Sequence, residues 1–149
     1  MSSRLQRYSY EFSLIFLDLN IDCREVPVGA WFSFLAQVGQ ALKASCRLID
    51  FAFRDGDTGS AILLPQTSKD AACKWACDLS KWFRNAELLR YAGKSVKLPA
   101  YIGVVSYPKD ATTKRELLLL ADETMSLVRE KGRGGVAAAN IGILQLENS

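Results

Sequence analysis

The sequence predicts an α+β fold, an α/β sandwich built on a ferredoxin-like βαββαβ core with an extra α-β unit. Short β-rich apolar runs, which predict strands, occur at 11–19, 48–54, 60–64, 98–107 and 136–146. Segments with apolar residues at helical spacing occur at 31–42, 71–83 and 117–128. This order, with the preference for right-handed crossovers, predicts one central, mainly antiparallel sheet with helices on one face.

The first strand-like run is a short apolar segment that ends close to Asp18, which is typical of a buried strand. Pro27 and Gly29 break the chain before the first helical segment. Between the second and third strand-like runs, residues 55–59 read DGDTG. This is a hairpin signal, because glycine accepts positive φ values at no steric cost.

The second helical segment follows Pro65, which ends the preceding strand. Thr67, with Asp70 three residues later, is predicted to cap this helix. Trp75 and Trp82 are seven residues apart on its apolar face, and we interpret them as core residues. The polar, basic stretch at 84–97 is predicted to be a loop.

The third helical segment begins after Pro108, which ends the strand at 98–107. Thr113 with Glu116 predicts its cap, and its apolar face includes Leu118 and Met125. Glycines at 132, 134 and 135 end the helix, and residues 136–146 are predicted to form one last strand.

Composition and charge exclude several kinds of function. With 149 residues, 49% of them hydrophobic, the chain predicts one domain (11–146) with an N-terminal extension (1–10) and a short tail (147–149). Histidine is absent, which excludes catalytic triads and His-ligated zinc. A scattered net charge of +3 predicts no nucleic-acid partner. We expect no membrane insertion and, since the four cysteines form no CxxC pattern, a reducing cytoplasm.

Four motifs resemble those of the GGDEF family, the diguanylate cyclases that condense two GTP molecules into c-di-GMP. Residues 54–65 (RDGDTGSAILLP) align without a gap on R-Y-G-G-D-E-F-x-x-x-L-P, and Phe16-Leu-Asp18 matches the first-strand segment with the metal-binding Asp. Residues 101–108 (YIGVVSYP) match S-I-G-V-x-x-Y-P, and residues 121–133 match A-D-x-A-x-Y-x-A-K-x-x-G-R. The resemblance covers nearly the whole chain in the family's order, and it implies a nucleotidyl-cyclase-like fold.

The resemblance places a vestigial nucleotide and metal site at Asp18, Asp57, Arg129 and Arg133. Cyclisation needs divalent metals held by carboxylates, but the acidic pair of the family signature is replaced by Thr58 and Gly59. The segment that reads guanine in active members is also shortened here, between residues 20 and 29. We therefore expect no catalytic residue, no bound metal, no cofactor and no enzyme activity. The two arginines also suit the helix dipole alone, as basic residues near a helix C-terminus.

The sequence retains the motif of one ligand-binding site of the family. Arg47-Leu-Ile-Asp50 has the R-x-x-D pattern through which many GGDEF domains bind c-di-GMP, with Arg on phosphate and Asp on the guanine edge. An equally simple interpretation is that Arg47 and Asp50 pair with each other. The family often adds an Arg from the second helix, where this chain has Asp78, which repels phosphate. Lys74 or Lys81 could replace that Arg only if the helix were rotated, so we expect binding that is weak or depends on a dimer.

The expected function is that of a catalytically inactive GGDEF domain acting as a regulatory module. The resemblance implies a c-di-GMP receptor in a signalling or exopolysaccharide assembly, with biofilm or cellulose production as the process. The expected partners are c-di-GMP, another protein of such a complex and, in one arrangement, a second copy of the chain. We expect the chain to be a piece of a longer protein or a subunit of a complex. The alternative is a docking scaffold that binds no nucleotide.

Overall fold

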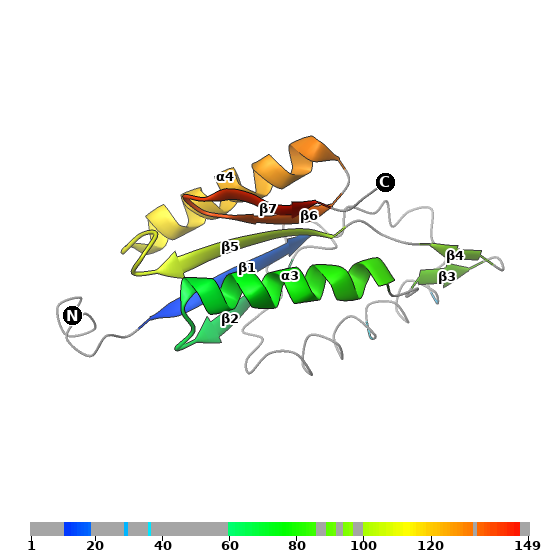
Figure 1. The fold of residues 1–149 in the computed structure, drawn as a ribbon, viewed down its shortest axis with the longest axis horizontal. Helices are drawn as coiled ribbons and strands as arrows, with labels where there is room; N and C mark the ends of the chain where they lie inside the picture. Colours follow the sequence, from blue (N-terminus) through cyan, green and yellow to red (C-terminus); the bar gives the residue numbers. More distant parts are fainter. Residues whose placement is uncertain are drawn as a thin grey trace.

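The structure, a computed structural model, describes residues 11–18, 60–85, 89–91, 94–96, 100–132 and 134–146, and the single positions 29 and 36. Within these residues the strands are β1 (Phe12–Asp18), β2 (Ser60–Pro65), β3 (Leu89–Tyr91), β4 (Lys94–Val96), β5 (Tyr101–Tyr107), β6 (Gly135–Ala138) and β7 (Gly142–Leu146). The helices with described bounds are α3 (Lys69–Asn85) and α4 (Lys114–Lys131) (Figure 1).

The main sheet has the strand order β2-β1-β5-β6-β7. β1 lies antiparallel to both β2 and β5, β5 and β6 are parallel, and β6 and β7 are antiparallel. A mixed sheet in which three of these four pairings are antiparallel confirms the predicted α+β class. β3 and β4 form a separate two-stranded ribbon.

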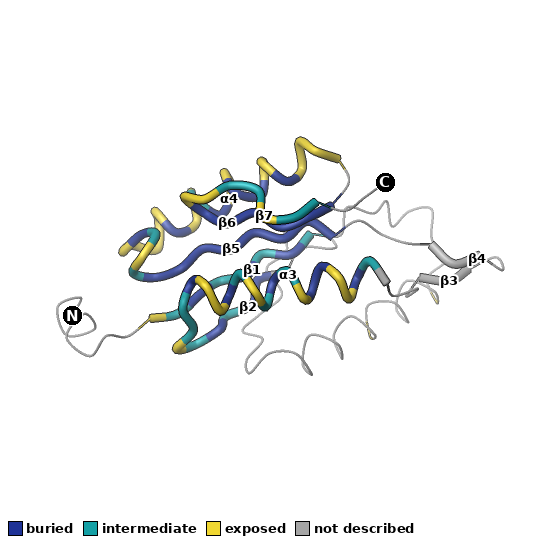
Figure 2. Tube along the Cα trace, in the orientation of Figure 1, coloured by how far each residue is buried: buried dark blue, intermediate teal, exposed yellow. Residues whose placement is uncertain are grey.

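The helices α3 and α4 lie on opposite faces of the sheet (Figure 1), so the prediction of helices on one face was wrong. All seven residues of β5 are buried, as Figure 2 shows along that strand. Ile102 and Val104 pack in the cluster with α3, whereas Val105 and Tyr107 pack in the cluster with α4. Because successive strand residues point to opposite faces, a central strand buried along its whole length requires cover on both sides.

Both ends of α4 agree with the prediction from the sequence, whereas the cap at the start of α3 differs from it. Thr113 is the N-cap of α4 and its hydroxyl accepts from the backbone N–H of Glu116, while Gly132 ends the helix in the left-handed region. The start of α3 differs from the prediction. The Ser68 hydroxyl accepts from the Ala71 N–H, whereas the Thr67 hydroxyl turns back to donate to the carbonyl of Pro65.

Several other segments depart from the predictions. Residues 84–97 hold the end of α3 and the β3–β4 ribbon, whose strands are too short to show a period. The last predicted strand is two strands, β6 and β7, because Asn140 (φ 63°) and Gly142 (φ 114°) adopt positive φ and reverse the chain. Gly29, predicted as a break, is helical, as is Ala36. The rest of the predicted helix at 31–42, and the strand at 48–54, lie outside the described residues.

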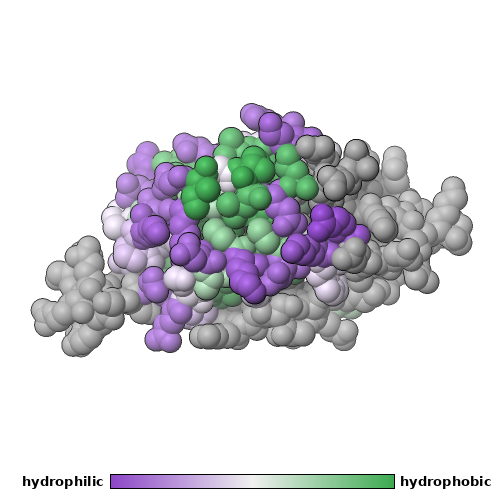
Figure 3. Space-filling view, viewed as in Figure 1, coloured by the Kyte–Doolittle hydropathy of each residue, from purple (hydrophilic) through white to green (hydrophobic). Residues whose placement is uncertain are grey.

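Not every apolar residue of the two helices faces the core. Leu118 and Trp82, both predicted to be core residues, are each 38% exposed. Leu118 and Leu119 on α4 are exposed, as are Ile141 and Leu144 on the β6–β7 hairpin, and we call Ile141 and Leu144 the apolar patch. Figure 3 shows an apolar area over β7 and the adjoining part of α4. None of the described helices is both long enough and apolar enough to cross a membrane.

Candidate functional site

Asp18 is the last residue of β1, at the end of the sheet where the chain enters β2. Leu17 pairs with Ser60, the first residue of β2, and Asp18 pairs with Tyr101, the first residue of β5. The hairpin predicted at 55–59 immediately precedes Ser60, so it leads to the strand end beside Asp18. Asp57 itself lies outside the described residues.

Arg129 reaches this strand end from the last turn of α4. Its Nη2 and Nε donate hydrogen bonds to the same oxygen of Asp18, Oδ2, at 2.9 and 3.2 Å. The ion pair is partly accessible, with 40% of the Arg129 side chain and 21% of the Asp18 side chain exposed. Two of the four residues that the resemblance placed in a vestigial site are therefore in contact, although 111 positions separate them. Arg133 lies outside the described residues.

The packing of α4 on β5 sets the position of Arg129. A Cβ atom on Gly103 would lie 2.9 Å from the Met125 sulfur, so the glycine lets the helix approach the strand closely. Met125 and Val128 are buried in one cluster with Tyr101. Arg129 follows Val128 directly, and it points to the exposed end of the same strands.

Among the described residues, Asp18 forms an ion pair with Arg129 and does not belong to a cluster of metal ligands. In the part of the chain that the structure describes, no three His, Cys, Asp or Glu side chains gather where they could hold a metal ion. The carboxylate oxygen Oδ2 is already engaged by a guanidinium, which supplies one positive charge and directed donors. A divalent cation in a phosphoryl-transfer site requires several oxygen donors, so the described donor set does not fit one.

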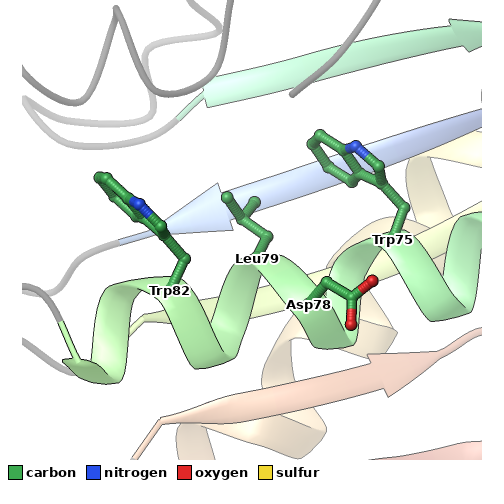
Figure 4. Close-up of a pocket in the computed structure, with 4 residues that line it drawn as sticks. All are labelled: Trp75, Asp78, Leu79 and Trp82. Carbon is green, nitrogen blue, oxygen red and sulfur yellow. The ribbon is translucent and has the colours of Figure 1, made fainter. Parts of the chain in front are cut away.

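The second candidate region is a shallow pocket on α3 with a volume of about 320 Å³. Its described lining residues are Trp75, Asp78, Leu79 and Trp82, and Figure 4 shows the two indoles and Leu79 on the same side of the helix. Trp82 packs edge-to-face on Phe83, with the ring centroids 5.0 Å apart. The prediction that Trp82 lies in the core was wrong, because the tryptophan lies at the edge of the apolar face of α3.

The charges beside this pocket bear on the predicted c-di-GMP site. Asp78 and Lys74 are both largely exposed, and Lys74 Nζ lies 3.9 Å from Asp78 Oδ2. The lysine is thus close enough to compensate the charge of Asp78 in part. Arg47 and Asp50 lie outside the described residues.

The two described cysteines are one helical turn apart on α3. Cys73 and Cys77 carry free thiols, and both are half-buried. Burial raises the pKa of both thiols above the ordinary value of 9.0. At neutral pH they are therefore protonated and weakly nucleophilic.

A family model described as "Diguanylate cyclase, GGDEF domain" matches residues 33–135 of this chain. The chain belongs to the GGDEF family. Two curated relatives are each 29% identical to this GGDEF domain over 68% of its length: YhcK of Bacillus subtilis, and MucR of Pseudomonas aeruginosa, a bifunctional diguanylate cyclase/cyclic di-GMP phosphodiesterase. The chain spans 28% of YhcK and 14% of MucR.

Solved GGDEF structures share the fold. The GGDEF domain of PA1120 (TpbB or YfiN) from Pseudomonas aeruginosa superposes with a TM-score of 0.76 at 22% identity, covering 94% of this chain and 83% of that one. The GGDEF domain of DgcB from Caulobacter crescentus, in complex with c-di-GMP, gives 0.74 at 14% identity over 93% and 81%. The diguanylate cyclase SiaD from Pseudomonas aeruginosa, in complex with its activator SiaC, gives 0.75 at 20% identity over 93% and 54%.

Proposed function

We propose that this GGDEF domain is catalytically inactive and serves as a regulatory module, a c-di-GMP receptor in a signalling or exopolysaccharide assembly. The observation that carries the proposal is the ion pair between Asp18 and Arg129. It engages the carboxylate that the family resemblance assigns to the metal. Biofilm or cellulose production is the process that inactive GGDEF modules suggest by analogy.

Inactivity follows from the charge requirements of phosphoryl transfer. The reaction places negative charge on the reacting phosphate, and metal ions held by carboxylates neutralise it. In this chain Asp18 is paired with Arg129, and the sequence has Thr58 and Gly59 where the family has its acidic pair. Incubation of the domain with GTP and Mg²⁺ is therefore expected to give no c-di-GMP by chromatography. Product formation that Asp18→Ala abolishes would contradict this part of the proposal.

The receptor role rests on the retained Arg47-x-x-Asp50 motif. The family relative DgcB binds c-di-GMP in its GGDEF domain, and Arg is suited to both the phosphates and the guanine faces of such a ligand. Asp78 on α3 weakens the attraction for phosphate, although Lys74 lies beside it. We therefore propose weak binding, or binding completed by a second protomer.

Calorimetry with c-di-GMP tests this role directly. Wild type should release heat that Arg47→Ala abolishes and that rising salt reduces, because the contact between Arg and phosphate is screened. Arg115→Ala is the matched control, since Arg115 is an exposed arginine of α4 that is not part of the motif. Heat equal to that of buffer for wild type would refute the receptor role and leave the docking scaffold.

The docking scaffold is favoured by the apolar patch. Ile141 and Leu144 are 59% and 36% exposed on the same hairpin, and exposed apolar side chains of this kind often mark a protein contact. SiaD, a family relative, forms a complex with an activator protein. If the domain is a scaffold, Ile141→Glu should abolish binding to the partner without changing the melting temperature, whereas Arg47→Ala should leave it intact.

A further inference from the structure

The ion pair at the end of β1 involves the residue that the family resemblance assigns to metal binding. Asp18 Oδ2 accepts two hydrogen bonds from one guanidinium. Within the described residues no cluster of carboxylates joins it. The donor set of the described residues therefore disagrees with the divalent-cation site that the family membership suggests.

We propose that Arg129 is a built-in counter-ion that keeps divalent cations away from Asp18. A cation approaching Oδ2 meets the positive charge of the guanidinium, and it must break both hydrogen bonds before it can contact the oxygen. Partly exposed ion pairs of this kind contribute up to about 1 kcal/mol, so Arg129 should lower the cation affinity of the carboxylate by about fivefold. Arg129 is then the residue that lowers the affinity of this strand end for divalent cations.

The counter-ion is held in place by the packing of α4. Met125 and Val128, in the turn that carries Arg129, are 5% and 0% exposed. Gly103 seats Met125 closely against β5. The helix backbone cannot withdraw from Asp18 without exposing this apolar cluster, so the guanidinium leaves Oδ2 only through a change of the Arg129 side chain.

Titration with Mn²⁺, followed by paramagnetic broadening of backbone amide signals, tests the proposal without reference to activity. The reporter is the amide of Tyr101, which is paired with Asp18 in the sheet. Arg129→Met should bind Mn²⁺ at this position about fivefold more tightly than wild type. Asp18→Asn combined with Arg129→Met should lose the gain, and Arg115→Met, on an exposed arginine of the same helix, should behave as wild type.

Two outcomes overturn the inference: equal Mn²⁺ affinity at Tyr101 in wild type and Arg129→Met, or a gain that survives in the double variant. Arg129→Gln keeps the test informative if the methionine variant unfolds, because it retains a polar side chain at the exposed helix end. Binding of c-di-GMP and turnover of GTP do not enter the measurement, so this inference and the proposed function can fail separately.

Discussion

The pair formed by Lys69 and Asp110 lies at the end of the sheet opposite Asp18, and its removal should destabilise the domain strongly. Lys69 opens α3, and Asp110 follows β5; their side chains are 4% and 1% exposed. The Lys69 ammonium donates to Asp110 and to the carbonyl of Ala139. Asp110 also accepts from the backbone N–H of Ser106 at 2.7 Å and from the Asn140 amide at 3.2 Å. One carboxylate thus ties together α3, the loop after β5 and the β6–β7 turn.

The loss of stability depends on which buried charged or polar groups each substitution leaves without a partner. Removing one partner of a buried ion pair typically costs about 3–5 kcal/mol. Asp110→Ala leaves a buried ammonium with one carbonyl and leaves the Ser106 N–H without its acceptor, so we expect the upper end of that range. Lys69→Met leaves a carboxylate that still has two donors, so we expect the lower end. The double variant Lys69→Met/Asp110→Leu should cost much less than the sum, because it leaves no unpaired charge.

Urea denaturation followed by circular dichroism measures these differences, and the melting temperature should fall by about 2–4 °C per kcal/mol in a chain of this size. Lys74→Met is the control, because the Lys74–Asp78 pair is exposed and should contribute less than about 1 kcal/mol. A single variant that costs no more than this control, or a double variant as unstable as the sum of the singles, would refute the reasoning.

Three further outcomes are expected. Gly103→Ala should cost about 1–3 kcal/mol in urea denaturation, because the added methyl group meets the Met125 side chain. Met125→Ala in the same background should recover part of this stability, and little recovery would show that the backbone has shifted instead. Thr113→Ala should cost about 1 kcal/mol by removing the α4 cap, whereas Thr113→Ser, which keeps the hydroxyl, should cost far less. Because burial raises the pKa of Cys73 and Cys77, the unfolded chain loses these protons first and stability should fall as the pH rises past 9.0; a Cys73→Ala/Cys77→Ala variant should lose this slope in urea titrations.

Local signals predicted the elements well where one residue type dominates the local geometry. The cap at Thr113 and the stop at Gly132 are set within a few residues, and both are confirmed. The turn between β6 and β7 was missed, although Asn140 and Gly142 are both residues that accept positive φ. The apolar residues on either side of that turn made the segment resemble one long strand.

The arrangement of the helices required information that no local pattern holds. The face on which each helix packs depends on which residues of β5 it covers, and β5 is buried on both faces. The family resemblance assigned Asp18 and Arg129 to one site, but their direct contact depends on the close seating of α4 at Gly103. Trp82 was placed in the core because periodicity identifies the apolar face of a helix and not its edge.

The two ends of the sheet carry opposite kinds of ion pair, and this contrast bears on the proposed function. The Lys69–Asp110 pair is buried, and its hydrogen bonds join three segments of the fold, so it serves the scaffold. The Asp18–Arg129 pair is partly exposed, and its acid is the one that the family resemblance assigns to metal. Because it is partly exposed, this pair contributes little to stability. What it changes there is the charge that an approaching ligand meets, which is the property on which the proposed binding module depends.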